Sequence, residues 1–110
     1  MNKHLMKLQS NPFQKIKDGT KTIELRLFDE KRQKLQLGDE IEFTNTENPD
    51  DKLLAKVVGL LRYKSFEDLY KDYSPEATGS DTKDDRKLMR KYYSEEDEKK
   101  FGVLGIRIKI

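Results

Sequence analysis

Three charged side chains, Lys21, Glu24 and Arg26, stand close together in the stretch GTKTIELRL. Arginine and lysine donate hydrogen bonds to phosphate groups and base edges, whereas a carboxylate orients a guanidinium group or accepts from an amino group. A lysine whose pKa is lowered by burial also serves as a general base. These residue types therefore indicate either a site for a nucleotide-like ligand or a small hydrolytic centre.

The stretch that carries these side chains has the alternation of a β-strand. Ile23, Leu25 and Leu27 point to one face and Glu24 and Arg26 to the other, because successive strand side chains alternate. One face is expected in the core. The charged face has two interpretations: it forms the floor of a cleft roofed by later helices, or it carries an ion pair on an exposed sheet, worth at most about 1 kcal/mol.

The segment before this strand predicts one more strand and a short helix. Residues 4–9 alternate weakly and end at a turn sequence. Ser10 or Asn11 is expected to cap the helix, with Pro12 in its first turn. Gly19 is expected to end the helix in a left-handed conformation.

The middle of the chain predicts two further strands. A Gly38–Asp39 turn precedes an alternating strand over residues 40–44, and residues 44–52 read as a polar loop. Residues 53–63 are apolar on both faces, which predicts a central strand covered on both sides. Gly59 indicates a bulge within that strand.

The last third predicts two helices and a closing strand. Ser65 is expected to cap the first of these helices. Asp81 or Thr82 is expected to cap the second, and residues 101–110 alternate as a terminal strand. The second helix has an apolar stripe of Leu88, Met89, Tyr92 and Tyr93.

The resulting order is β-α-β-β-β-α-α-β, in which helices do not alternate with every strand. This order disfavours a doubly wound parallel sheet and predicts an α+β fold, a small mixed β-barrel flanked by short helices. With 110 residues, the chain is expected to form a single domain over residues 1–110.

The amino-acid composition limits the kinds of binding and catalytic site that the chain can form. The net charge of +2 arises from 23 basic and 21 acidic residues, so binding of nucleic acid requires a local patch. The chain has no cysteine and a single histidine, His4, which excludes a thiolate zinc site and a histidine-based triad within one chain. We expect no metal, no cofactor and no membrane partner, a cytoplasmic location and, by default, a monomer.

The combination of GTKTIELRL, KLQLGDEIEF and the closing GVLGIRIKI resembles the ASCH domain of the PUA-like superfamily. Lys21, Glu24, Arg26, Gly38 and Asp39 stand where that family places its recurrent residues. The resemblance implies a small barrel flanked by helices, with a cleft between them that accepts RNA or a modified nucleoside.

Some members that this chain resembles are hydrolases. The bacterial acetylcytidine amidohydrolases share the KTI step and use a lysine, a threonine and a glutamate. Lys21 falls on the position of their lysine, but Glu24 falls where they have the threonine nucleophile. Their distal glutamate aligns near Glu76. The replaced nucleophile argues against that amidohydrolase activity.

Further residues are expected to assist Lys21, Glu24 and Arg26 in binding a ligand. Lys31 and Arg32 lie in a basic loop that steers phosphates toward the cleft or is simply solvated. Tyr63 and Ser65 stand at a strand-to-helix junction, a position suited to lining a cleft. The expected nucleic-acid-binding residues are Lys21, Glu24, Arg26, Lys31, Arg32, Tyr63 and Ser65.

Three functions remain open at this level. The first is an RNA- or nucleotide-binding module, in which we expect Arg26→Ala to weaken RNA binding with little loss of melting temperature. The second is a small hydrolase of a modified nucleoside or of RNA, with Lys21 and Glu24 as its catalytic groups. The third is a protein-interaction module that uses the helical insert.

Overall fold

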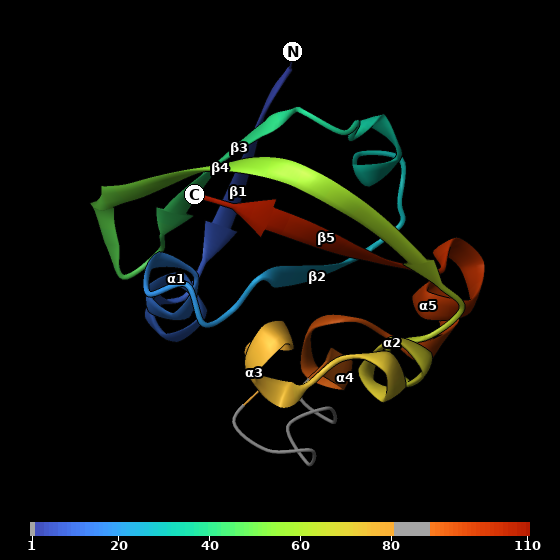
Figure 1. Ribbon diagram of the computed structural model, residues 1–110. Helices are drawn as coiled ribbons and strands as arrows, with labels where there is room; N and C mark the ends of the chain where they lie inside the picture. Colours follow the sequence, from blue (N-terminus) through green and yellow to red (C-terminus); the bar gives the residue numbers. More distant parts are fainter. Residues whose placement is uncertain (1, 81–88) are drawn as a thin grey trace.

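The computed structural model of the protein, described for residues 2–80 and 89–110, is built on one curved, mixed sheet (Figure 1). The strand order is β1-β3-β4-β5-β2, so β1 and β2 are its two edges. β1 runs parallel to β3, and the other neighbours are antiparallel. The strands are β1 (Lys3–Leu8), β2 (Ile23–Leu27), β3 (Glu40–Asn45), β4 (Asn48–Tyr63) and β5 (Val103–Lys109).

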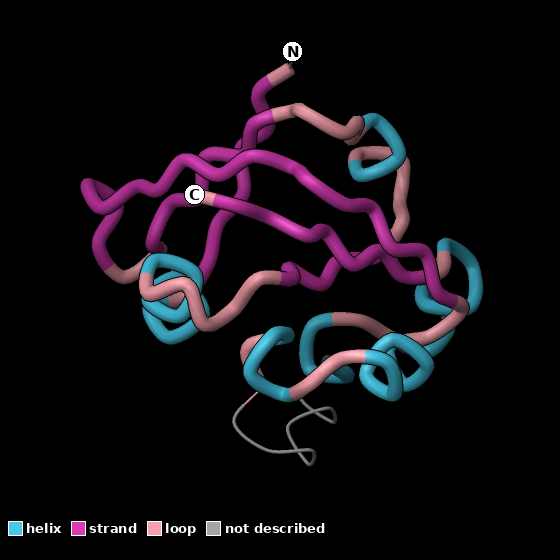
Figure 2. Tube along the Cα trace, in the orientation of Figure 1, coloured by secondary structure: helices cyan, strands magenta, loops and turns pink. Residues whose placement is uncertain are grey.

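Short helices pack around this half-barrel, and the later ones gather beside β2 (Figures 1 and 2). They are α1 (Ser10–Lys17), α2 (Phe66–Asp72), α3 (Pro75–Thr78), α4 (Met89–Tyr92) and α5 (Glu95–Phe101), with a 3₁₀ turn η1 (Arg32–Lys34). No helix in the described ranges is long and apolar enough to cross a membrane.

Two apolar clusters lie on opposite faces of the sheet. Inside the half-barrel, Phe13 of α1 packs with Phe43 and Ile106. On the other face, β2 packs through Ile23, Leu25 and Leu27 against α2 and its neighbours. Burial of this apolar surface is the main stabilising contribution in the fold.

Strand β2 is therefore an edge strand that is covered on both faces. Glu24 pairs with Ile106 and Arg26 pairs with Leu104 in the β2–β5 ladder. Paired residues point to the same face of a sheet, so both charged side chains face the half-barrel interior. The sequence order of the strands and the α+β barrel-like architecture are confirmed, and so is the turn of the chain at Gly19, whose φ is +83°; the described residues between β4 and β5, however, include helices α2, α3, α4 and α5 rather than the two predicted helices.

The predicted cap of α1 is wrong. The helix begins at Ser10, and Gln9 occupies the N-cap position without a side-chain hydrogen bond. Pro12 lies in the first turn as expected. The Ser10 hydroxyl instead donates to Asn45 Oδ1 at 3.0 Å, which ties the helix start to the end of β3.

The middle of the chain differs from expectation in two respects. Residues 48–52 belong to β4 rather than to a loop, so the hairpin between β3 and β4 is short. Strand β4 is also not covered on both sides, because Leu54 is 47% and Val58 is 44% exposed. The predicted bulge at Gly59 is confirmed by the register shift between Val57 and Gly59. This bend allows the later half of β4 to meet the helices while the earlier half has one face in solvent.

Helices α3 and α5 are not predicted by the hydrophobic pattern of the sequence. Each follows a serine cap, Ser74 for α3 and Ser94 for α5; α3 has only four residues, and α5 (EEDEKKF) is almost entirely charged, so neither shows an apolar helical period. The expected caps Asp81 and Thr82 lie outside the described residues. Of the predicted second late helix, residues Met89–Tyr92 are described, as α4.

Candidate functional site

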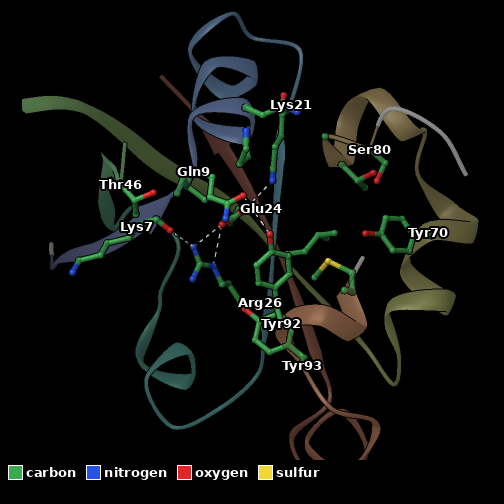
Figure 3. A pocket seen from close by; sticks show the side chains of 17 residues that line it. Lys7, Gln9, Lys21, Glu24, Arg26, Thr46, Tyr70, Ser80, Tyr92 and Tyr93 are labelled. Carbon is green, nitrogen blue, oxygen red and sulfur yellow. Dashed lines mark hydrogen bonds and ion pairs between the residues drawn. The ribbon is translucent and has the colours of Figure 1, made fainter. Parts of the chain in front are cut away.

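A cavity of about 330 Å³ lies where the two edge strands face each other (Figure 3). One wall is the end of β1 and the start of α1, including Gln9. The second wall is β2 with Glu24 and Arg26. The third comes from the segment after β4, which contributes Ser80 and Tyr92. The charged face of β2 is therefore concave and roofed, as the cleft interpretation requires.

Lys21, Glu24 and Arg26 form one buried ion cluster at the floor of this cavity. Lys21 Nζ lies 2.8 Å from Glu24 Oε1, and Arg26 contacts Glu24 Oε2 through Nε at 2.9 Å and Nη2 at 2.8 Å. Glu24 is 3% exposed and Lys21 is 8% exposed. Both carboxylate oxygens are thus occupied by cations, and the cluster keeps a net positive charge.

Arg26 also connects the two edges of the sheet. Its Nη2 donates to the main-chain carbonyl of Lys7 at 3.1 Å, on strand β1. The side chain of Lys7 points away from the cavity (Figure 3). A charged donor on a carbonyl at an open edge satisfies a group that the sheet leaves unpaired. The guanidinium therefore fixes the width of the seam at which the cavity lies.

The cluster determines the charge state of its carboxylate. Burial alone raises the pKa of Glu24, but Lys21 and Arg26 outweigh burial and lower this pKa from 4.5 to about 2. For Arg26, burial acts in the opposite direction and lowers the pKa. The Glu24 carboxylate and the Tyr93 hydroxyl outweigh burial, so the pKa of Arg26 lies above its ordinary value. Glu24 is therefore ionised at neutral pH and poorly suited to donating or accepting a proton.

The roof is docked onto the residues before β2. Thr22 N–H donates to the carbonyl of Ala77 in α3 at 2.9 Å, and Lys15 Nζ donates to the carbonyl of Gly79 at 3.1 Å. Gly79 ends α3 with φ of +79°, and a Cβ built there would lie 2.5 Å from Cδ of Lys21. The absence of a side chain at Gly79 thus makes room for the Lys21 stem beneath the roof.

Aromatic side chains complete the cavity. Tyr93 stacks on the Phe66 ring with a centroid distance of 5.5 Å, and burial raises its pKa although Arg26 partly opposes this. Tyr92 is 55% exposed and its hydroxyl reaches Gln9 Oε1 at 3.4 Å (Figure 3). A half-exposed ring at the mouth of a charged cavity is a surface on which a planar ligand can stack.

Two further residues expected at the site lie in the charged connection after β2. Lys31 is exposed, and Arg32 pairs with Asp29 through Nη1 at 3.0 Å. Neither residue lines the cavity. Arg32 is nonetheless close enough to lower the pKa of Tyr93 in part. The basic loop thus borders the aromatic wall from outside.

The two residues at the strand-to-helix junction have structural contacts elsewhere. Tyr63 donates its hydroxyl hydrogen to Asp72 at 2.7 Å, which is the main reason that the pKa of Tyr63 lies above its ordinary value. Ser65 accepts from the N–H of Asp68 at 3.1 Å and caps α2. Glu76 is exposed on α3 and also does not line the cavity.

Sequence reasoning missed the residues that close the cavity. The hydrophobic pattern of the sequence places Tyr92 and Tyr93 in an apolar stripe and predicts no element at Thr78, Gly79 and Ser80. The pattern of a serine cap, a proline in the first turn and a glycine stop in SPEATG predicts a one-turn helix, and this signal was available in the sequence. Within the described ranges, no group of three or more histidine or acidic side chains is arranged to hold a metal ion.

The fold and this seam cavity define a PUA-like α+β domain. The family model of the ASCH domain matches residues 6–110, and the chain therefore belongs to the ASCH domain family. No curated protein matches the sequence.

Solved structures resemble the whole chain. It is 37% identical to the hypothetical protein PH0355, over 97% of both chains, with a TM-score of 0.86. It is 32% identical to protein PF0455 from Pyrococcus furiosus, over 97% of this chain and 96% of that one, with a TM-score of 0.76. The ASCH protein from Zymomonas mobilis is 16% identical, over 99% of this chain and 68% of that one, with a TM-score of 0.70, and shows the fold alone.

Proposed function

We propose that this protein binds RNA or a nucleotide-like ligand in the cavity between β1 and β2. The observation that carries the proposal is the convergence of Lys21, Glu24 and Arg26 on the floor of a roofed cavity. An exposed ion pair on a flat sheet would leave no enclosed space for a ligand.

The size and lining of the cavity support a nucleotide-like ligand. Ligand pockets begin at about 300 Å³, so this cavity accommodates one small planar group and excludes a duplex. A net positive floor favours an anionic ligand, and an aromatic rim favours a flat one. Nucleotides combine these two properties.

The cluster offers donors in fixed positions. In the part of the chain that the structure describes, the Lys21 ammonium contacts one acceptor, Glu24, and an ammonium group has three N–H donors. The remaining donors are available to a phosphate or a base edge. Glu24 holds Lys21 and Arg26 in place before any ligand arrives, which lowers the ordering cost of binding.

The same contacts weigh against the hydrolase alternative. A carboxyl group with a pKa of about 2 and two occupied oxygens is a poor general acid or base at neutral pH. Glu24 therefore serves as an orienting group in this proposal, and binding is favoured over turnover.

A stacking test at the rim checks the proposal without disturbing the buried cluster. Nucleoside monophosphates and a single-stranded RNA are titrated into the wild type, Tyr92→Ala and Tyr92→Phe. Loss of one stacked base costs about 1–3 kcal/mol, so Tyr92→Ala is expected to weaken binding by roughly 5- to 150-fold. Tyr92→Phe keeps the ring and is expected to bind like the wild type.

Two outcomes would count against binding as the function. Equal affinities of all three proteins for every probe would remove Tyr92 from the site, and absence of binding in the wild type would remove the proposal altogether. Turnover of an acylated cytidine or of the RNA that is abolished by Lys21→Ala would instead assign the hydrolase function.

A further inference from the structure

The convex face of β1, β3 and β4, with the end of β5, carries a set of lysines arranged in register. Lys7, Thr44 and Lys52 form one row across the three strands. Leu5, Glu42 and Leu54 form the next row, in which both leucines are exposed. The third row is Lys3, Glu40, Lys56 and Lys109. We call these three rows the lysine face.

The lysine face is more strongly charged than the molecule as a whole. It holds five lysines and two glutamates, whereas the entire chain has a net charge of +2. Lys3 pairs with Glu42 at 3.1 Å. Within residues 2–80 and 89–110, Lys7, Lys52 and Lys56 have no carboxylate partner in an ion pair. Their charges are therefore available to an anionic partner.

The helices within residues 2–80 and 89–110 do not cover this face. In Figure 1 the helices lie inside the half-barrel and beside β2, away from the convex side of β1, β3 and the first half of β4. The exposed fractions of Leu5, 62%, and Leu54, 47%, agree with this arrangement. A lysine-rich face with aliphatic side chains between the lysines is a surface along which a phosphate chain can lie.

The lysine face adjoins the cavity at Lys7. The Lys7 carbonyl accepts from Arg26 in the cavity, while its side chain points outward next to Thr44 of β3. Thr46, which follows this row at the end of β3, lines the cavity rim. A polymer that leaves the cavity past Thr46 therefore meets Lys7 first and Lys52 next.

We infer that the ligand of the cavity is one nucleotide of a single-stranded RNA, whose phosphate backbone continues across the lysine face. This inference rests on the proposed function and deepens it, because it distinguishes a polymer from a free nucleotide. The acidic residues Glu47 and Asp50 near the tip of the β3–β4 hairpin repel phosphates, so the backbone runs over Lys52 toward Lys56.

Neutralising two lysines of β4 tests the inference. The variant Lys52→Gln/Lys56→Gln removes two charges from the lysine face and leaves every cavity residue intact. The control variant Lys71→Gln/Lys99→Gln removes two exposed lysines from α2 and α5. Each protein is titrated with nucleoside monophosphates and with a single-stranded RNA of about ten nucleotides, at salt concentrations from about 50 to 200 mM.

The expected result is a selective loss. Lys52→Gln/Lys56→Gln is expected to bind the RNA about tenfold more weakly and to lower the slope of log affinity against log salt by about 1.4. Its affinity for monophosphates and the RNA affinity of the control variant are expected to match the wild type. A single-stranded RNA that binds no more tightly than a monophosphate, or equally to both variants, overturns the inference.

The failures are distinguishable. If monophosphate binding depends on Tyr92 but RNA binding does not change in Lys52→Gln/Lys56→Gln, the proposed function stands and the lysine face has no part in it. Absence of binding to either probe removes both. A protein partner that binds the lysine face and stays bound after nuclease treatment would also overturn the inference.

Discussion

Arg26 on one edge strand donates to the Lys7 carbonyl on the other, across the open seam of the half-barrel. Strands β1 and β2 follow each other in sequence, yet they occupy opposite edges of the sheet, because α1 carries the chain from one edge to the other. The seam between them is where an incomplete barrel leaves space. Arg26 and Glu24 line that space, so the position of the cavity follows from the sheet topology.

Replacement of Arg26 tests how far the cluster stabilises the fold. Sequence reasoning expects Arg26→Ala to leave the melting temperature nearly unchanged, but the side chain is largely buried against Glu24. Removing one partner of a buried ion pair costs about 3–5 kcal/mol. We therefore predict a loss of this order in the free energy of unfolding, measured by urea denaturation.

A conservative change separates charge from geometry at the same position. Arg26→Lys keeps the positive charge but cannot reach Glu24 and the Lys7 carbonyl together, so we expect an intermediate loss of stability. Arg107→Lys, an exposed arginine on β5, is the matched control and is expected to unfold like the wild type. Equal stability of Arg26→Ala and the wild type would show that the cluster contributes nothing to folding.

The pH dependence of stability reports on Glu24. Its pKa is lowered from 4.5 to about 2 in the folded protein, so the unfolded chain binds its proton first as the pH falls. The corresponding stabilisation, on the order of 3 kcal/mol, is fully present above pH 4.5 and is lost as the pH falls toward 2. We predict that the free energy of unfolding of Glu24→Gln falls less steeply than that of the wild type between pH 4.5 and pH 2, because the variant lacks the Glu24 contribution.

The measurement is the difference between wild type and Glu24→Gln in denaturant unfolding across that pH range. Asp39 also loses stabilisation in acid, since the hydrogen bond from His4 is the main cause that lowers its pKa, and it does so in both proteins. Subtraction therefore isolates Glu24. Parallel pH profiles for the two proteins would contradict the charge state assigned to the cluster.

Asp39 is predicted to matter for the fold and not for binding. Its carboxylate accepts from the N–H groups of Gln36 and Asn2 and from the His4 ring, and so it fastens the start of β1 beside β3. Asp39→Asn replaces one acceptor oxygen by an amide donor and is expected to lower the urea midpoint. RNA affinity measured well below that midpoint is expected to stay at the wild-type value, and a selective loss of affinity would place Asp39 in the site.

The sequence predicts β2 and its charged face because alternation is a local property of the chain. The same reasoning cannot place Tyr92 or Gln9, since these residues meet only when the segment after β4 folds back onto the end of β1. Tyr63 and Ser65 show the converse error: a strand-to-helix junction has exposed polar groups, but here Asp72 and Asp68 engage them. Short helices such as α3 depend on caps and tertiary contacts, which periodicity does not detect.

Two glycines with the same backbone conformation provide the sharpest test of the roof. Gly79 has φ of +79° and Gly19 has φ of +83°, so alanine at either position carries a similar left-handed penalty of about 1–2 kcal/mol.

The two positions differ in their surroundings. A Cβ at Gly79 meets Cδ of Lys21 at 2.5 Å, whereas a Cβ at Gly19 has nothing within 4 Å. Gly79→Ala is therefore expected to displace Lys21 from Glu24, to lose stability beyond the backbone penalty and to weaken binding of the ligand, while Gly19→Ala loses only the backbone penalty and keeps its affinity. Titration of both variants with nucleoside monophosphates and RNA, alongside urea unfolding, compares the two effects. Because the backbone cost is shared, a loss of affinity confined to Gly79→Ala attributes the effect to the position of the Lys21 ammonium, and equal affinities would mean that Lys21 does not contact the ligand.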